Sequence, residues 1–245
     1  MATHIRQVVL FIQECGFTLE LRELTVATAC MLFHKYKHSP NRTLPLLIGQ
    51  KDNILDGSLH LPVSAGTENL TEDYLVATSC LLLAGKTEEN HLNIRKLINV
   101  AYKTFFKEKE LADIDEYYSM RTSILTLELW LLRIVGFHPV CNHPHQYLVC
   151  FLKACQDWLP RDEFKRHPVA AVAWSLLRDA YLSELVIQEK PEHIALTIVA
   201  CALQLLKITF PTENGSHRPW TKAFCHDLSS EHLDRLTIQL TRAYQ

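Results

Sequence analysis

The stretch YLVATSCLLLAGKTEE, from Tyr74 to Glu89, predicts the centre of this fold. It is apolar and rich in small residues until its last turn, where Lys86 appears, followed by two acids. A segment that is apolar on most sides is typical of a helix buried among other helices. We therefore predict that this stretch forms the central helix of a helical domain.

The composition is that of an ordinary globular protein. The 245 residues are 48% hydrophobic and 21% charged, which allows one large domain or two of about 100–150 residues. A net charge of −2 gives no reason to expect direct binding to nucleic acid or to a membrane surface. We interpret the eight cysteines, which include no CxxC pair, as reduced thiols. Since no signal peptide is recognised, we expect an intracellular protein, nuclear or cytoplasmic, that is not secreted.

Apolar residues recur at helical spacing along most of the chain, and no alternating strand pattern is clear, so we predict an all-α fold. The helices expected in the first half are 3–15, 25–36, 74–89, 92–106 and 115–135. Those expected in the second half are 146–158, 168–182, 191–206, 220–228 and 230–244. We expect Gly16 to end the first helix, and Thr71 and Ser229 to cap the third and the last.

The second half repeats the pattern of the first. VATAC at 26–30 matches VAAVA at 169–173, an offset of 143 residues (169 − 26). ATSCLLLAG at 77–85 matches ALTIVACAL at 195–203, an offset of 118 residues (195 − 77). The first half therefore holds about 25 more residues between its second and third helices.

The excess falls in the segment 39–70, which is rich in proline and glycine and has no sustained period. We interpret it as a loop insertion between helices two and three of the first repeat. The prediction is two tandem five-helix repeats, with a first domain at 1–140 and a second at 141–245. Two unrelated helical domains are the alternative.

Two charged residues stand out against their surroundings. Glu128 is the only acid in SILTLELWLLRIVGF, 123–137, and its neighbours three and four residues away are all apolar. An unpaired buried carboxylate is costly, so its partner must lie elsewhere in the fold or in another molecule, unless it is a rim residue that touches water. Lys86 is either a simple helix-end charge or a group aimed at a partner.

Together, Lys86 and Glu128 suggest a recognition device. If helices three and five of the first repeat lie side by side, a lysine that donates and a glutamate that accepts could bind the backbone of a foreign segment. The second repeat has Gln204 at the position of Lys86, so the device belongs to the first repeat only.

No enzyme signature is found. Glycine-rich nucleotide loops, the GxSxG turn and HExxH are all missing from the sequence, so we expect no enzyme, no cofactor and no small-molecule substrate. Cys141, His143 and His145 look like metal ligands, but no second set follows at a suitable spacing. We expect no metal site there and interpret His143–Pro144–His145 as the opening of the next helix.

These motifs resemble the cyclin family. LAGKTEE at 83–89 and LELWLLRIVGF at 127–137 carry the resemblance within the two repeats, and FHPV with HPHQYL is similar to the linker of the transcription-associated cyclins. The resemblance covers nearly the whole chain except 39–70. It implies two cyclin boxes and a non-catalytic subunit that forms a heterodimer with a cyclin-dependent kinase and repositions its C-helix. The branch that it resembles most implies cyclin-dependent kinase ten as the partner.

The resemblance also implies roles for single residues. Lys86 and Glu128 match the pair that hydrogen-bonds the main chain around the kinase C-helix, and Leu75 matches an apolar kinase contact. Thr87 stands where an aromatic residue often follows the lysine, so this contact is weakened or replaced. Arg6 matches an arginine that supports the box internally.

Two other function classes remain as alternatives. A transcription adaptor of the TFIIB type uses the same repeat to bind DNA, but needs a zinc ribbon and basic outer faces that this sequence lacks. An enzyme with an unrecognised site is the other, and facing titratable side chains in a deep pocket would support it.

Overall fold

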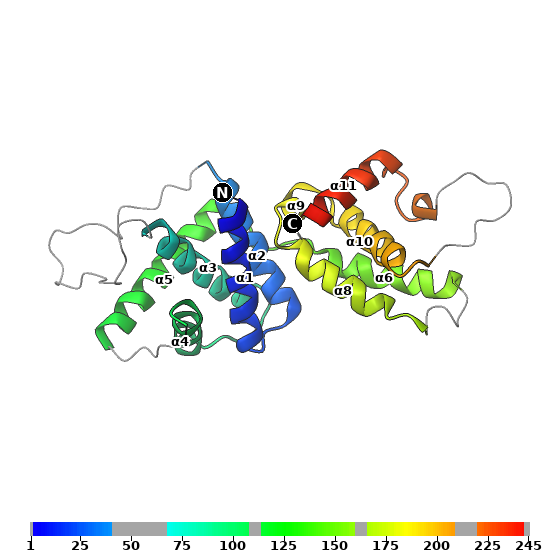
Figure 1. Cartoon of the computed structure of the whole chain (residues 1–245). Helices are drawn as coiled ribbons and strands as arrows, with labels where there is room; N and C mark the ends of the chain where they lie inside the picture. The colour runs from blue at the N-terminus through cyan, green and yellow to red at the C-terminus, as the bar shows by residue number, and fades with distance from the viewer. Residues whose placement is uncertain (1, 41–67, 108–113, 160–165, 209–219, 243–245) are drawn as a thin grey trace. The chain divides into compact units, whose positions relative to one another are not determined.

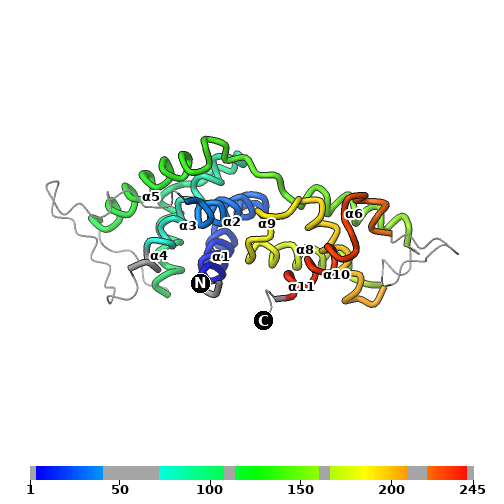
Figure 2. The backbone as a smooth tube through the Cα atoms, turned by 90° about the horizontal axis from the view of Figure 1, so that it is seen from above, coloured from blue at the N-terminus to red at the C-terminus, as the bar shows by residue number. Residues whose placement is uncertain are grey.

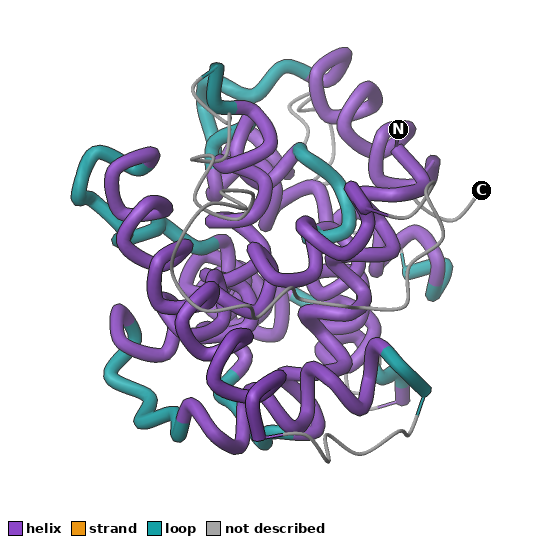
Figure 3. Tube along the Cα trace, turned by 90° about the vertical axis from the view of Figure 1, so that its left-hand side faces the viewer, coloured by secondary structure: helices purple, strands orange, loops and turns teal. Residues whose placement is uncertain are grey.

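The computed structural model of the chain describes residues 2–40, 68–107, 114–159, 166–208 and 220–242. Every regular element in these ranges is a helix (Figure 3), which confirms the all-α prediction. The chain divides into two compact units, Met1–Cys141 and Asn142–Gln245. Most of the predicted insertion, 41–67, lies outside the described residues.

The first unit is built around one buried helix. Its helices are α1 (Ala2–Thr18), α2 (Glu23–His38), α3 (Glu68–Thr87), α4 (Ile94–Phe105) and α5 (Ile114–Ile134). α3 contacts each of the other four, and Figures 1 and 2 show it among them. Val76, Cys80 and Leu81 on α3 are fully buried. The prediction that the apolar stretch is the central helix is confirmed.

Two predicted helix ends in this unit are wrong. Thr71 does not cap α3, because the helix already begins at Glu68; residues 68–72 contain no glycine or proline that would interrupt it. Gly16 does not end α1, which continues to Thr18. A Cβ at Gly16 would come within 2.4 Å of Val26 Cγ2, so glycine is needed there for close packing against α2 rather than as a stop.

The second unit also has a buried central helix. Its elements are α6 (Pro144–Trp158), α8 (Val169–Ala180), α9 (Leu185–Gln188), α10 (Pro191–Leu205), η2 (Trp220–Ala223) and α11 (Ser230–Arg242). α10 contacts α6, α8, α9 and α11, and Ala195, Leu196 and Ile198 on it are fully buried. The expected helix 220–228 forms only the short η2, and α9 was not expected. The strict five-helix repeat stays a prediction.

Two further expectations concern capping and cysteine. The backbone N–H of His232 donates to Ser229 Oγ at 3.2 Å, so the predicted cap of α11 is confirmed. All eight cysteines are free thiols, and most are buried, although Cys150 is exposed. Within the described ranges, no helix combines the length and the apolar character needed to cross a bilayer.

Candidate functional site

Polar contacts fix the end of α3. Thr28 on α2 donates from Oγ1 to Glu88 Oε1 at 2.7 Å. Asn90, in the turn that follows α3, donates from Nδ2 to Thr25 Oγ1 at 3.1 Å. Both contacts tie the turn after Lys86 to α2, so the lysine projects from an anchored backbone.

Gly85 allows this turn to pass close to the helix. The backbone N–H of Asn90 donates to Gly85 O at 2.9 Å. A Cβ added at Gly85 would lie 3.1 Å from Asn90 O and 3.3 Å from Leu92 Cβ. The glycine that precedes Lys86 is therefore a packing requirement of the turn.

Lys86 and Glu128 meet between α3 and α5. Lys86 Nζ lies 2.6 Å from Glu128 Oε1 and donates to Oε2 at 2.8 Å. The Glu128 side chain is only 6% exposed, whereas that of Lys86 is 60% exposed. The buried carboxylate thus finds its partner on another helix of the same unit, and the lysine reaches it from the surface.

The pair keeps hydrogen-bonding capacity for a third group. An ammonium group has three N–H donors, and a carboxylate has about four lone-pair sites. With two donors directed at Glu128, one N–H of the exposed Lys86 remains available. A main-chain carbonyl of another molecule could accept it without breaking the ion pair.

The other residues singled out from the sequence lie nearby or deeper. Leu75 on α3 is buried, with 6% exposed, which leaves little of its surface for a partner. Thr87 is half-buried, and its Oγ1 donates to Leu83 O at 2.9 Å within the same helix. Arg6 is half-buried on α1. Its role as an internal support stays a prediction.

Sequence reasoning missed an apolar surface on α5. Ile114, Tyr118 and Leu129 are 71%, 56% and 63% exposed, and their spacing of 4 and 11 residues places them on one side of the helix. We call these three residues the α5 stripe. Leu129 follows Glu128 directly and so lies next to the ion pair, while Arg121 and Thr122 are exposed between it and Tyr118. Exposed apolar patches mark interaction surfaces, but sequence alone cannot tell which side of an apolar helix is exposed.

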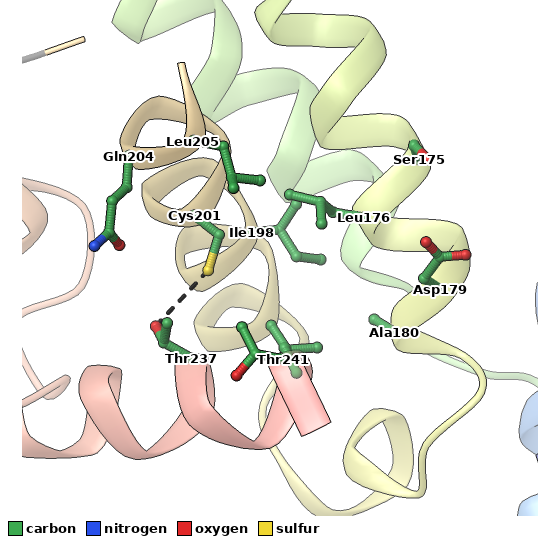
Figure 4. A pocket seen from close by; sticks show the side chains of 11 residues that line it. Ser175, Leu176, Asp179, Ala180, Ile198, Cys201, Gln204, Leu205, Thr237 and Thr241 are labelled. Carbon is green, nitrogen blue, oxygen red and sulfur yellow. Dashed lines mark hydrogen bonds between the residues drawn. The ribbon is translucent and has the colours of Figure 1, made fainter. Parts of the chain in front are cut away.

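The second unit contains a cavity of about 580 Å³ between α8, α10 and α11 (Figure 4). Asp179 and Cys201 are the titratable residues among those that line it. Cys201 Sγ donates to Thr237 Oγ1 at 3.7 Å, and burial raises the pKa of this thiol, which keeps it protonated and a poor nucleophile. The described lining therefore offers no facing acid–base pair.

The metal-like cluster of the linker has other contacts. Lys35 Nζ donates to Cys141 Sγ at 3.4 Å. His143 Nδ1 and His145 Nδ1 lie 3.0 and 3.4 Å from the hydroxyl of Tyr181. α6 begins at Pro144 with His143 as its N-cap residue, which confirms that this segment opens the helix.

Comparison with known proteins finds relatives over most of the chain. The chain is 23% identical over 244 residues to cyclin-T1-3 of Oryza sativa subsp. japonica, and this match covers 96% of the chain. It is 25% identical over 238 residues to cyclin-L2 of Mus musculus (95% of this chain) and 25% identical over 173 residues to cyclin-K of Homo sapiens (70%). The relatives found are cyclins, and the chain is similar to them over most of its length. The chain spans 41%, 39% and 29% of the lengths of these three relatives.

The relatives are of the transcription type, in agreement with the resemblance seen in the sequence. No family model matches the chain. Among solved structures, a chain in the crystal structure of the yeast RNA Pol II CTD kinase CTDK-1 complex has a TM-score of 0.69. The match has 16% sequence identity and covers 99% of this chain and 66% of the other. At this identity, the similarity supports the fold alone.

Proposed function

We propose that this cyclin is a non-catalytic regulatory subunit that binds a cyclin-dependent kinase as a heterodimer and repositions the kinase C-helix. The observation that carries the proposal is the Lys86–Glu128 pair, with its exposed ammonium group next to the α5 stripe. The similarity to cyclins over most of the chain supports the same conclusion. The relatives found are cyclins, which favours this function over a TFIIB-like adaptor.

The pair supplies the polar part of the interface. Lys86 donates its remaining N–H to a main-chain carbonyl near the kinase C-helix, and Glu128 accepts from a main-chain N–H. Hydrogen bonds to charged groups contribute roughly 1.5–3 kcal/mol each. Because contacts of Thr28 and Asn90 anchor the end of α3, little conformational entropy is lost there when the kinase binds.

The α5 stripe supplies the apolar part. Burying Tyr118 and Leu129 against the kinase removes exposed apolar surface from water, at roughly 25 cal/mol per Å². Thr87 offers only a small contact where an aromatic residue is usual, so the stripe bears more of the apolar burial. Leu75 packs behind the interface and Arg6 supports the first box.

Activation follows from differential binding. A kinase whose C-helix samples inward and outward positions shifts toward the inward one if the cyclin binds that state more tightly. The inward position completes the Lys–Glu ion pair of the kinase and its catalytic geometry. The cyclin thus contributes a docking surface and no chemistry.

The finer assignment concerns the partner and the domains. We assign the two units to an N-terminal box at 1–140 and a C-terminal box at 141–245. TVATACMLFHKY and HPVAAVAWSLLRDAY resemble the cyclin Q branch most closely, which makes cyclin-dependent kinase ten the proposed partner. That partner places the cyclin inside the cell, in the nucleus or the cytoplasm.

An activation assay tests this function. Purified cyclin-dependent kinase ten is assayed on a peptide substrate with and without the cyclin, beside a panel of other cyclin-dependent kinases. We expect phosphorylation to rise on addition of the cyclin, most strongly with kinase ten, and the cyclin alone to transfer no phosphate. If no kinase in the panel is stimulated or bound, the proposal is wrong.

A further inference from the structure

Three side chains of the second unit converge where α9 ends and where α10 and α11 begin. Glu189 follows α9, His193 lies in the first turn of α10, and His232 lies in the first turn of α11. One carboxylate oxygen or ring nitrogen from each lies within 4.8 Å of the others. We call these residues the Glu189 cluster.

His193 is the buried member of the cluster and is not fully satisfied. It is 5% exposed, and its Nε2 lies 3.2 Å from Asp227 Oδ1. Its other ring nitrogen, Nδ1, is buried with no hydrogen-bond partner. A buried polar atom without a partner is uncommon and costs free energy.

Hydrogen bonds explain only part of this arrangement. His232 Nε2 lies 3.1 Å from Glu189 Oε2, and Arg235 Nη2 lies 3.7 Å from Glu189 Oε1. Neither contact provides a hydrogen-bond partner for His193 Nδ1. Metal-binding histidines are commonly held in the same way, with a carboxylate on one ring nitrogen, and Asp227 is placed to do this.

We propose that Glu189, His193 and His232 bind one Zn²⁺ ion. Two imidazoles and one carboxylate form a donor set that suits zinc, with a fourth position left for water. The ion would join three segments that are far apart in sequence, the end of α9 and the starts of α10 and α11. A ligand that binds only the folded chain stabilises it, so zinc holds α11 against α9 and α10 of the same unit. This site is independent of the proposed kinase-binding surface.

The direct test is zinc binding to the full chain after it has been stripped of metal with a chelator. Equilibrium dialysis is expected to give one Zn²⁺ per chain at micromolar free zinc. His232→Ala and Glu189→Gln should each weaken binding by at least about tenfold. His91→Ala is the matched control, since His91 is an exposed histidine of the first unit, and it should bind as the wild type does.

Cobalt distinguishes this site from the cysteines. Co²⁺ bound by the Glu189 cluster is expected to show ligand-field bands without a thiolate charge-transfer band. Zinc should also raise the thermal unfolding midpoint of the wild type and of His91→Ala, but not that of Glu189→Gln, which keeps the size of the side chain.

Three results would overturn the proposal: no stoichiometric zinc on the wild type, a thiolate band with Co²⁺, or unchanged affinity in both cluster variants. If His232→Ala does not fold, the wild-type stoichiometry, the Co²⁺ spectrum and the affinity of Glu189→Gln still test the proposal.

Discussion

Lys86 and Glu128 are 42 residues apart in the sequence, and the Lys86 Nζ atom lies 2.6 Å from Glu128 Oε1. One partner is mostly exposed and the other is buried. The surface lysine therefore satisfies a buried carboxylate, so the pair has a structural role in addition to the binding role that we propose. Experiments on this pair have to separate the two.

A double-mutant cycle measures the structural role. Lys86→Ala leaves the buried Glu128 carboxylate without its partner and should lower the free energy of unfolding by about 1–3 kcal/mol. The Lys86→Ala/Glu128→Ala variant removes both charges, so its cost should be smaller than the sum of the two single costs. Urea unfolding of the four proteins gives the values. Strictly additive costs would mean that the pair does not interact in solution.

Gly85→Ala tests the close turn after α3. Alanine has the higher helix propensity by about 1 kcal/mol, but its Cβ would press on Asn90 O. Asn90 is held by hydrogen bonds from its Nδ2 to Thr25 Oγ1 and from its backbone N–H to Gly85 O. Because that backbone cannot easily move, we expect a net loss of about 1 kcal/mol, seen as a lower thermal midpoint. A higher thermal midpoint for Gly85→Ala would contradict this prediction and show that the turn can move to accommodate the Cβ.

Acid should destabilise the second unit through His145. Burial, and to a lesser extent the neighbouring His143, lowers the pKa of His145 from 6.5 to about 4. Between about pH 6.5 and 4, His145 is protonated in the unfolded chain but neutral in the folded chain. The free energy of unfolding therefore falls as the pH falls through this window. The loss should reach roughly 2–3 kcal/mol near pH 4. His145→Gln should show a shallower pH dependence in urea unfolding, and an unchanged slope would contradict this assignment.

The α5 stripe predicts a binding defect without a folding defect. Leu129→Asp places a charge on an exposed position, so the thermal midpoint should change little. Kinase affinity should fall at least about tenfold, because the charge would have to be buried against the partner. Leu10→Asp is the matched control, an exposed leucine on α1, and should leave affinity unchanged. Equal affinities for the two variants would remove the stripe from the interface.

Local pattern was enough to predict much of the first unit. The apolar run before Lys86 predicts a central helix, and Glu128 is conspicuous because every residue three or four positions away from it is apolar. Thr71 and Gly16 were misread for a physical reason. A capping residue competes with a chain that is already helical, and a glycine is needed wherever another segment comes close, as Val26 does.

The Glu189 cluster shows what local pattern cannot reach. Glu189 and His193 are four residues apart, but His232 comes from a separate helix. Each of them has polar neighbours in the sequence, so none stands out as Glu128 does. The spacing of Glu189 and His193 was the available signal, and it has meaning only once α11 is placed beside α10.

The most direct test of the central claim is the affinity of a purified cyclin-dependent kinase, kinase ten first, for the Lys86→Ala/Glu128→Ala variant, measured by isothermal titration calorimetry. Lys96→Ala is the control, because it removes an exposed lysine of α4. We expect the double variant to fold and to bind at least about tenfold more weakly, while the control binds as the wild type does. A folded double variant with wild-type affinity would contradict the account.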